Sequence, residues 1–324
     1  MIGQEQGTTM PGVASSARGT GLIGIDIGGT KISALLVSAD GDVLARGGVP
    51  APAALGGEAM ADAAADLAGS LAGEAGVTLV AAGVGAAGVI DHESGTIRAA
   101  SATFVGWAGF ALADALETRL GVPVRVENDV NAFLLGEAAA AGRTEQDVLG
   151  VMLGTGVGGA LLIDGGLHHG PHGAAGEIGH TPGYSELVCT CGQIGHLETL
   201  ASGTSIVLRY QERTGGAILD ARDVADRARR GDGDAIAVFD AAGRALALAC
   251  ASAATLLDLP CAIVGGGVTA AWDLLEPAIT RTLRTDSPVS GIPLRIVPAV
   301  LGADAVALGA IETARRALTP AGAR

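Results

Sequence analysis

The chain has 324 residues with a formal net charge of −14, and 49% of its residues are hydrophobic. This length exceeds what one hydrophobic core usually supports, so we expect two domains. The acidic balance disfavours binding to nucleic acid or to anionic membranes, because both require clustered Lys and Arg. The sequence contains no run of about 18 apolar residues, so a membrane span is not expected. Residues 1–20 lack the pattern of a signal peptide and are expected to form a disordered tail.

The first half of the chain predicts alternating strands and helices. Short apolar runs predict strands, Asp40-Gly41 is typical of a hairpin turn, and Ala and Leu at helical spacing predict an amphipathic helix. The expected elements are strands at Leu22–Ile27, Ile32–Val37, from Val43, at Val77–Val84 and at Val122–Val126, with helices at Glu58–Ala75 and Phe110–Leu120.

The second half repeats this logic. Its expected elements are strands at Val148–Leu153, Ala160–Ile163, Cys261–Val264 and Leu294–Val297, with helices at Gly203–Arg213, Ala221–Arg229, Ala235–Leu257 and Val306–Ala317. Each half opens with a strand, a glycine-rich turn and a second antiparallel strand. Two such halves predict two α/β domains flanking a cleft.

The two glycine-rich turns have the chemistry of phosphate loops. One is Gly28-Gly29-Thr30-Lys31, and the other is Gly154-Thr155-Gly156-Val157-Gly158-Gly159. Glycine lets backbone amides approach phosphate oxygens, and Asp26 before the first turn could hold Mg²⁺ through water. One such turn alone could be an ordinary hairpin. Neither is a Walker A loop or opens a Rossmann unit, so the pair favours a triphosphate held between two domains.

The stretch Leu153–His180 resembles the signature of the ROK family, which comprises bacterial repressors, open reading frames and sugar kinases. The matching positions are Gly156, Gly158, Ala160, Gly170, Gly176 and Gly179-His180; Asp26–Lys31, Glu127-Asn128-Asp129 and Gly265–Gly267 match further motifs in the family's order. The resemblance covers about Gly21 to Ala317. It implies a two-domain, actin-like fold (hexokinase/Hsp70-type, ribonuclease H-like) with the sugar in the interdomain cleft.

The resemblance also implies domain limits and roles for the glycine motifs. We expect residues 21–120 and 303–324 to form the small domain, and residues 121–302 to form the large domain with a zinc-binding segment. ATP with Mg²⁺ is expected to contact Asp26, Gly28, Gly29, Thr30, Lys31, Gly154, Thr155, Gly156, Gly158, Gly265, Gly266 and Gly267. A homodimer or a dimer of dimers is expected from the family.

Asp129 follows Asn128 at the predicted end of a strand. A carboxylate within hydrogen-bond reach of a sugar hydroxyl can accept its proton during phosphoryl transfer. The resemblance implies that Asp129 is this base and that Asn128 holds a sugar hydroxyl. The alternative, that both residues cap a helix starting near Asn131, is compatible with these roles.

Four residues within seventeen positions, His180, Cys189, Cys191 and His196, form a Cys₂His₂ set. Thiolate and imidazole in a set of four suit a structural Zn²⁺, and thiolate ligands fit a reducing, cytoplasmic location. ROK kinases commonly have a Cys-x-Cys-Gly-x-x-Gly-Cys-x-Glu segment, and His196 stands here at its third Cys. The other histidines nearby, His168, His169 and His172, are expected to be loop or rim residues.

The family resemblance implies that Glu177, His180 and Glu198 bind sugar hydroxyls. The expected activity is ATP-dependent phosphorylation of a hexose 6-hydroxyl, with glucose as the first choice and N-acetylmannosamine or another sugar as the alternative. Many glucokinases place Asn shortly before the Trp of the pocket loop, where this chain has Thr103. A non-catalytic, sugar-responsive regulator is the alternative of a different class; its winged helix would need about 60–80 residues, and only about twenty precede Leu22.

Overall fold

The computed structural model describes residues 19–101, 103–144, 146–217 and 220–318. Residues 1–18 of the expected disordered tail lie outside this range, and Thr20 already begins the first strand. The strands are β1 (Thr20–Ile27), β2 (Lys31–Ser38), β3 (Val43–Pro50), β4 (Thr78–Ala86), β5 (Val89–Asp91), β6 (Thr96–Ala99), β7 (Val124–Asn128), β8 (Val148–Leu153), β9 (Val157–Ile163), β10 (Gly166–Leu167), β11 (Cys261–Gly265) and β12 (Arg295–Pro298).

The α-helices follow the expected order, with two additions. They are α1 (Gly57–Ala75), α2 (Leu112–Leu120), α3 (Asp129–Ala140), α4 (Glu198–Ala201), α5 (Gly203–Thr214), α6 (Ala221–Arg229), α7 (Gly233–Leu257), α8 (Trp272–Thr285) and α9 (Ala305–Leu318). Short 3₁₀ turns lie at Ala53–Leu55, Ile178–His180, Gly267–Ala271 and Gly302–Asp304. Helices α4 and α8 were not predicted.

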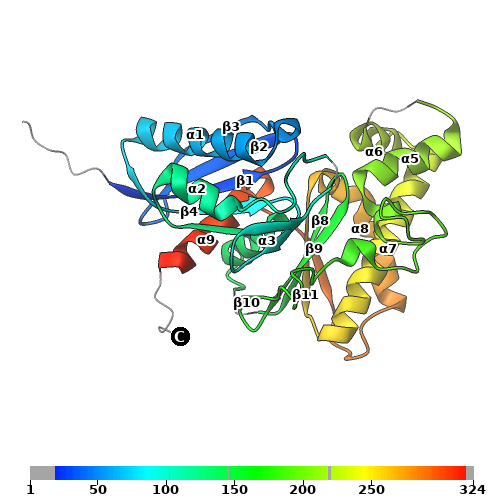
Figure 1. Cartoon of the computed structure of the whole chain (residues 1–324). Helices are drawn as coiled ribbons and strands as arrows, with labels where there is room; N and C mark the ends of the chain where they lie inside the picture. The colour runs from blue at the N-terminus through cyan, green and yellow to red at the C-terminus, as the bar shows by residue number, and fades with distance from the viewer. Residues whose placement is uncertain (1–18, 102, 145, 218–219, 319–324) are drawn as a thin grey trace, which may run out of the picture.

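Two five-stranded sheets with the same layout form the framework. The first has the order β3-β2-β1-β4-β7 and the second the order β10-β9-β8-β11-β12. In each sheet the first three strands are antiparallel and the last two run parallel to the central strand. The repeated topology confirms two α/β halves, which lie at the left and right of Figure 1. We call them the first and second lobes.

The first sheet continues past the expected domain limit at residue 120. Strand β7 pairs with β4 through Ala86 and Asn128, so the sheet reaches Asn128 before the chain enters α3. Helix α9 lies against β1, β4 and α3, which returns the end of the chain to the first lobe. The sheets therefore favour a division after Asn128 for the first segment, with α9 completing that lobe.

Helices α3 and α9 cross so closely that only glycine fits at the contact. A Cβ at Gly309 would collide with the carbonyl oxygen of Ala132, and one at Gly136 would collide with that of Ala305. The buried carboxylate of Glu137 on α3 accepts the backbone N–H groups of Val300 and Leu301, at 2.9 and 2.8 Å, just before α9. This crossing holds the two lobes together.

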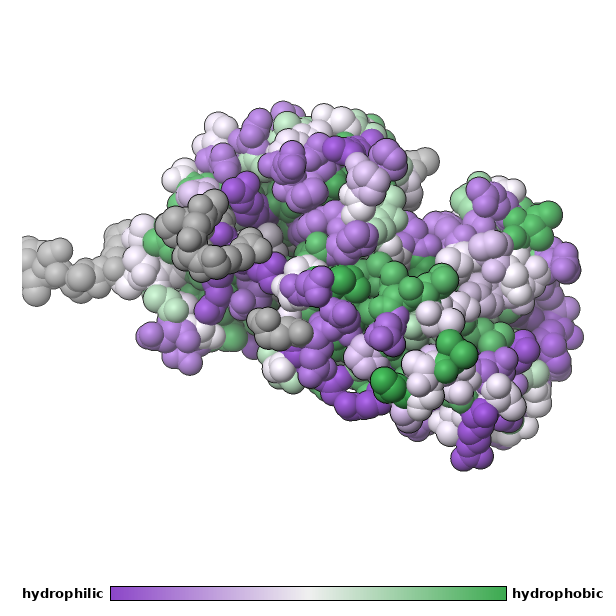
Figure 2. Space-filling model, turned by 90° about the horizontal axis from the view of Figure 1, so that it is seen from below, coloured by the Kyte–Doolittle hydropathy of each residue, from purple (hydrophilic) through white to green (hydrophobic). Residues whose placement is uncertain are grey.

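Separate hydrophobic cores lie in the two lobes, and a third cluster surrounds α3. Seen from below, hydrophobic residues gather near the middle of the molecule, while polar residues cover much of the remaining surface (Figure 2). Among the described residues, α7 alone is long and apolar enough to cross a membrane. Because 61% of its most apolar window is buried inside the protein, it has the properties of a core helix.

We predict that Gly309→Ala lowers the free energy of unfolding by about 1–3 kcal/mol, the usual cost of overpacking. Gly69→Ala on α1 is the matched control, because a Cβ there meets no atom within 4 Å. That variant should be neutral or more stable by up to about 1 kcal/mol from helix propensity. Urea unfolding measures both; equal effects of the two substitutions would contradict the close crossing.

Candidate active site and metal centre

A cavity of about 740 Å³ lies between the lobes and collects most of the predicted site residues. It is lined by both glycine turns, by the start of α3 and by the loop that precedes α4. The predicted residues among its lining are Gly28, Gly29, Asn128, Asp129, Gly154, Thr155, Gly156, Gly158, Glu177, His180 and Glu198. Those outside the lining are Asp26, Thr30, Lys31, Gly265, Gly266 and Gly267, together with the predicted metal ligands Cys189, Cys191 and His196.

Asn128 ends β7 and caps α3. Its side-chain oxygen accepts the N–H groups of Val130 and Asn131, at 2.8 and 3.2 Å. Its amide nitrogen donates to the carbonyl oxygen of Gly88 and to Oδ1 of Asp129, at 2.9 and 3.0 Å. The capping alternative is therefore confirmed for Asn128, whereas Asp129 is already the first residue of the helix, two positions before the expected start near Asn131. A sugar hydroxyl that binds Asn128 must replace one of these hydrogen bonds.

The pKa of Asp129 is raised to about 6, chiefly by burial of the carboxyl group. The negative charge of Glu177 raises this pKa further, while hydrogen bonds from the backbone N–H of Val130 and from Asn128 lower it. At neutral pH the carboxylate is thus largely ionised and able to accept a proton. It lies in the first turn of α3, where the helix dipole favours negative charge.

Asp26 lies at the end of β1, close enough to Asp129 for their charges to interact. Burial raises the pKa of Asp26 to about 7, and repulsion from Asp129 adds to this while Lys31 opposes it. A carboxyl group whose pKa is raised by burial and by a neighbouring carboxylate suits a divalent cation, since a cation relieves both the repulsion and the cost of burial. Lys31 itself lines a smaller cavity beside Arg46 and Asp304.

The glycines after β11 lie beside the second glycine turn, although they do not line the cavity. Gly266 has a φ of 89°, in the region that favours glycine. A Cβ at Gly266 would collide with the carbonyl group of Leu153, the residue that precedes Gly154. Strand β11 pairs with β8, so the packing holds this turn at the carboxyl end of the second sheet.

Glu198 connects the second glycine turn with the cysteine segment. Its Oε2 atom accepts the backbone N–H of Val157 at 2.9 Å, and its Oε1 atom accepts the hydroxyl of Thr190 at 2.7 Å. A Cβ at Gly156 would come 2.5 Å from Oε2. A larger residue at position 156 would therefore displace the carboxylate of Glu198 from the turn.

The four predicted metal ligands converge. Their ligand atoms all lie within 4.8 Å of one another. Nδ1 of His196 lies 3.4 Å from Nδ1 of His180 and 3.3 Å from Sγ of Cys191, and Nδ1 of His180 lies 3.7 Å from Sγ of Cys189. Zinc bonds of about 2.0–2.3 Å in a tetrahedron place neighbouring ligand atoms roughly 3.3–3.8 Å apart. The residues fit a zinc ion bound through both Nδ1 atoms.

Two features of the cleft were not predicted. Phe104 lines the cavity, and it stacks with the buried Trp107, whose indole N–H donates to the carbonyl oxygen of Ala87 at 3.0 Å. His169 lies in a loop, as expected, and it also contacts Glu127 of the first lobe, with 2.8 Å between Nε2 and Oε2. The contact between His169 and Glu127 joins residues 42 positions apart, so no local pattern in the sequence indicates it.

Comparison with known proteins places the chain in a family. The family model described as "ROK family" matches residues 22–317. The chain belongs to the ROK family. A glucokinase from Halalkalibacterium halodurans is 34% identical over 313 residues, which cover 89% of this chain and 92% of that protein. An N-acetylmannosamine kinase from Shigella flexneri is 35% identical over 249 residues, covering 76% of this chain and 83% of that one.

A solved structure supports the same conclusion for the fold. The ROK glucokinase from Streptomyces griseus, in complex with glucose and AMPPNP, is 32% identical with a TM-score of 0.78. The match covers 91% of this chain and 99% of that one. Together with the two equivalent sheets, this confirms the two-domain, actin-like fold.

Proposed function

We propose that this ROK protein is an ATP-dependent sugar kinase that phosphorylates the 6-hydroxyl of a hexose, with glucose as the preferred substrate. The observation that carries the proposal is the cavity, which brings Asp129 together with glycine turns from both lobes. A carboxylate base opposite two phosphate-type turns is the arrangement that phosphoryl transfer to a hydroxyl requires. The glucokinases with similar sequence and structure support the choice of sugar.

In the proposed reaction, the oxygen of the sugar 6-hydroxyl attacks the γ-phosphorus of ATP, and ADP leaves. Asp129 accepts the proton of this hydroxyl during the attack. Glu177, His180 and Glu198 hold other sugar hydroxyls, and Asn128 exchanges one of its present hydrogen bonds for the substrate. The glycine turns offer backbone N–H groups to the phosphates. Mg²⁺ bound with ATP would neutralise phosphate charge, with Asp26 holding it through water.

N-acetylmannosamine is the second candidate substrate. Thr103 stands where many glucokinases have Asn, and its Cγ2 lies 3.7 Å from the position of a Cβ on Gly29, at the edge of the cavity. The N-acetylmannosamine kinase from Shigella flexneri is 35% identical to the chain, but over 249 residues rather than the 313 residues of the glucokinase match. An ADP-release assay on glucose, mannose, fructose, N-acetylglucosamine and N-acetylmannosamine tests the proposal; no turnover of any sugar would contradict it.

The four converging ligands are proposed to hold a structural zinc. With Nδ1 of His180 on the metal, its Nε2 remains available to a sugar hydroxyl, and Gln193 contacts Nε2 of His196 at 3.2 Å. The ion would order the segment from residue 183 to Glu198. Thiolate ligation suits a reducing compartment, and a cytoplasmic location is part of the proposal.

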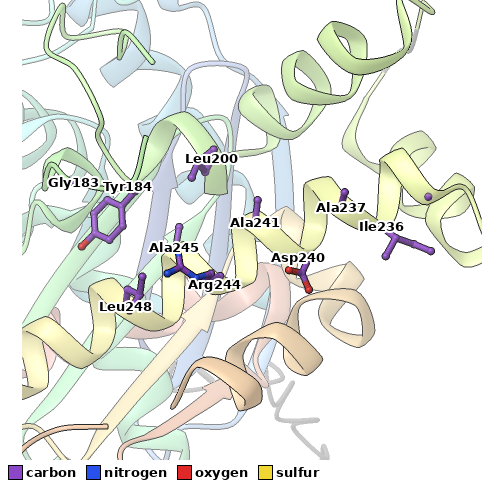
Figure 3. A pocket seen from close by; sticks show the side chains of 11 residues that line it. Gly183, Tyr184, Leu200, Ile236, Ala237, Asp240, Ala241, Arg244, Ala245 and Leu248 are labelled. Atoms are coloured by element: carbon purple, nitrogen blue, oxygen red, sulfur yellow. The ribbon is translucent and has the colours of Figure 1, made fainter. Parts of the chain in front are cut away.

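A homodimer is proposed to form through the outer face of α7. A cavity of about 490 Å³ lies there, lined by Tyr184, small residues and the oppositely charged Asp240 and Arg244 (Figure 3). If two α7 helices packed antiparallel, each Arg244 would lie near Asp240 of the other copy. The charges of this face are therefore complementary to those of a second copy. The small side chains allow close approach, and Ile236 on this face is 47% exposed. Sedimentation should give about twice the chain mass of 31.7 kDa.

We predict that Asp129→Asn lowers kcat by about 10²–10⁴-fold, the usual contribution of a general base, with sugar affinity retained. Protonation inactivates a base, so wild-type kcat/KM should fall as the pH drops through about 6, the pKa of Asp129. The variant should lack this acidic limb. Steady-state kinetics from pH 5 to 9 measures both, and near-normal turnover in the variant would exclude Asp129 as the base.

We predict that Cys191→Ser loses the metal and weakens sugar binding at least tenfold, because the segment that carries Glu198 becomes disordered. Cys250→Ala is the control, since Cys250 is buried in α7 away from the metal ligands. Mass spectrometry for metals should find one zinc per chain in the wild type and in the control. A metal-free protein with normal sugar affinity in calorimetry would disprove the role of the zinc.

A further inference from the structure

A loop of the second lobe reaches across to the first lobe beside the start of α3. It follows β10 and comprises residues 168–176. Within it, Nε2 of His169 lies 2.8 Å from Oε2 of Glu127, the penultimate residue of β7. The Glu127 side chain is 6% exposed and that of His169 is 18% exposed. The two lobes are therefore joined by a shielded polar contact.

Two more contacts hold the same loop on the first lobe. The ring of His169 stacks on that of His92, with 3.9 Å between centroids and 3° between planes. His92 lies in the turn between β5 and β6. Gly173, with a φ of 73°, lies so close to this hairpin that a Cβ would come 2.8 Å from the carbonyl oxygen of Ile90. The loop thus packs on the β5–β6 hairpin through both backbone and side chain.

The other oxygen of Glu127 holds the catalytic turn. Oε1 accepts the backbone N–H of Asn128 at 3.1 Å and the side-chain amide of Asn131 at 3.0 Å. One carboxylate consequently connects the loop of the second lobe to the residues on either side of Asp129. The same loop runs directly into Glu177, which faces the cavity.

We propose that His169 is a positioning residue: it latches residues 168–176 to the first lobe and, through Glu127, fixes the turn that directs Asp129 at the sugar. This inference rests on the proposed kinase function. Without the imidazole, Glu127 would be a buried carboxylate missing one partner, and such groups move or take up water to regain a hydrogen bond. A shift of about 1 Å at a catalytic group can cost up to about 10²-fold in rate.

Three variants test the latch. His169→Ala removes both the hydrogen bond and the ring, and should lower kcat about 10–100-fold while KM for ATP changes less than about threefold. His169→Gln keeps an N–H donor near the position of Nε2 and should recover at least a third of wild-type kcat. His172→Ala, an exposed residue of the same loop, should match the wild type. Wild-type kcat per folded molecule in His169→Ala, with the folded fraction from circular dichroism, would overturn the positioning role.

Hydrogen exchange on the full-length protein without substrate separates the latch from the proposed activity. His169→Ala should increase exchange at least fivefold in residues 89–92 and 168–176, while α7 keeps its protection. Unchanged exchange in these segments would overturn the latch. If the wild-type enzyme phosphorylates none of the sugars, the proposed function fails, and the exchange result alone then decides whether the latch exists.

Discussion

The proposed active site depends on the hydrogen bonds of the Asn128 side-chain amide. It accepts two backbone N–H groups of α3 and donates to Gly88 and Asp129, so all four of its hydrogen-bonding positions are engaged. Asp or Ser could cap the helix equally well. Only an amide both caps the helix and donates two hydrogen bonds, one of which orients the neighbouring carboxylate. The residue that caps α3 therefore also orients the carboxylate of Asp129, the proposed base.

In the second lobe, the carboxylate of Glu198 connects two segments of the site. Glu198 binds the turn between β8 and β9 with one oxygen and Thr190 of the cysteine segment with the other. The turn and the cysteine segment are therefore connected through one carboxylate. A sugar hydroxyl bound to Glu198 would share the carboxylate with these two contacts, which would couple sugar binding to the shape of the turn. The absence of a side chain at Gly156 makes this proximity possible.

Much of the framework could be predicted from sequence because it is locally encoded. Short apolar runs on either side of the glycine turns predicted β1, β2, β8 and β9 to within a few residues. The four proposed metal ligands could be recognised because they lie close together in the chain. Helix α8 was missed because Pro277 interrupts its helical pattern. The limit at residue 120 was placed before β7, since no local feature shows that β7 pairs with β4. The contact of His169 with Glu127 joins residues 42 positions apart, and no periodicity records it.

Burial gives Asp129 properties that an exposed carboxylate lacks. Raising its pKa to about 6 makes it a stronger proton acceptor while leaving it mostly ionised at neutral pH, which is the compromise a general base requires. Opposing effects determine the pKa of Asp129. Desolvation and the charge of Glu177 raise it, whereas the hydrogen bonds from the N–H of Val130 and the amide of Asn128 lower it. A sugar in the cleft would remove water, and this would strengthen both the effects that raise the pKa and the hydrogen bonds that lower it. The hydrogen bonds that Asp129 accepts from the N–H of Val130 and from the amide of Asn128 would therefore help to keep the proposed base charged when the cleft is filled.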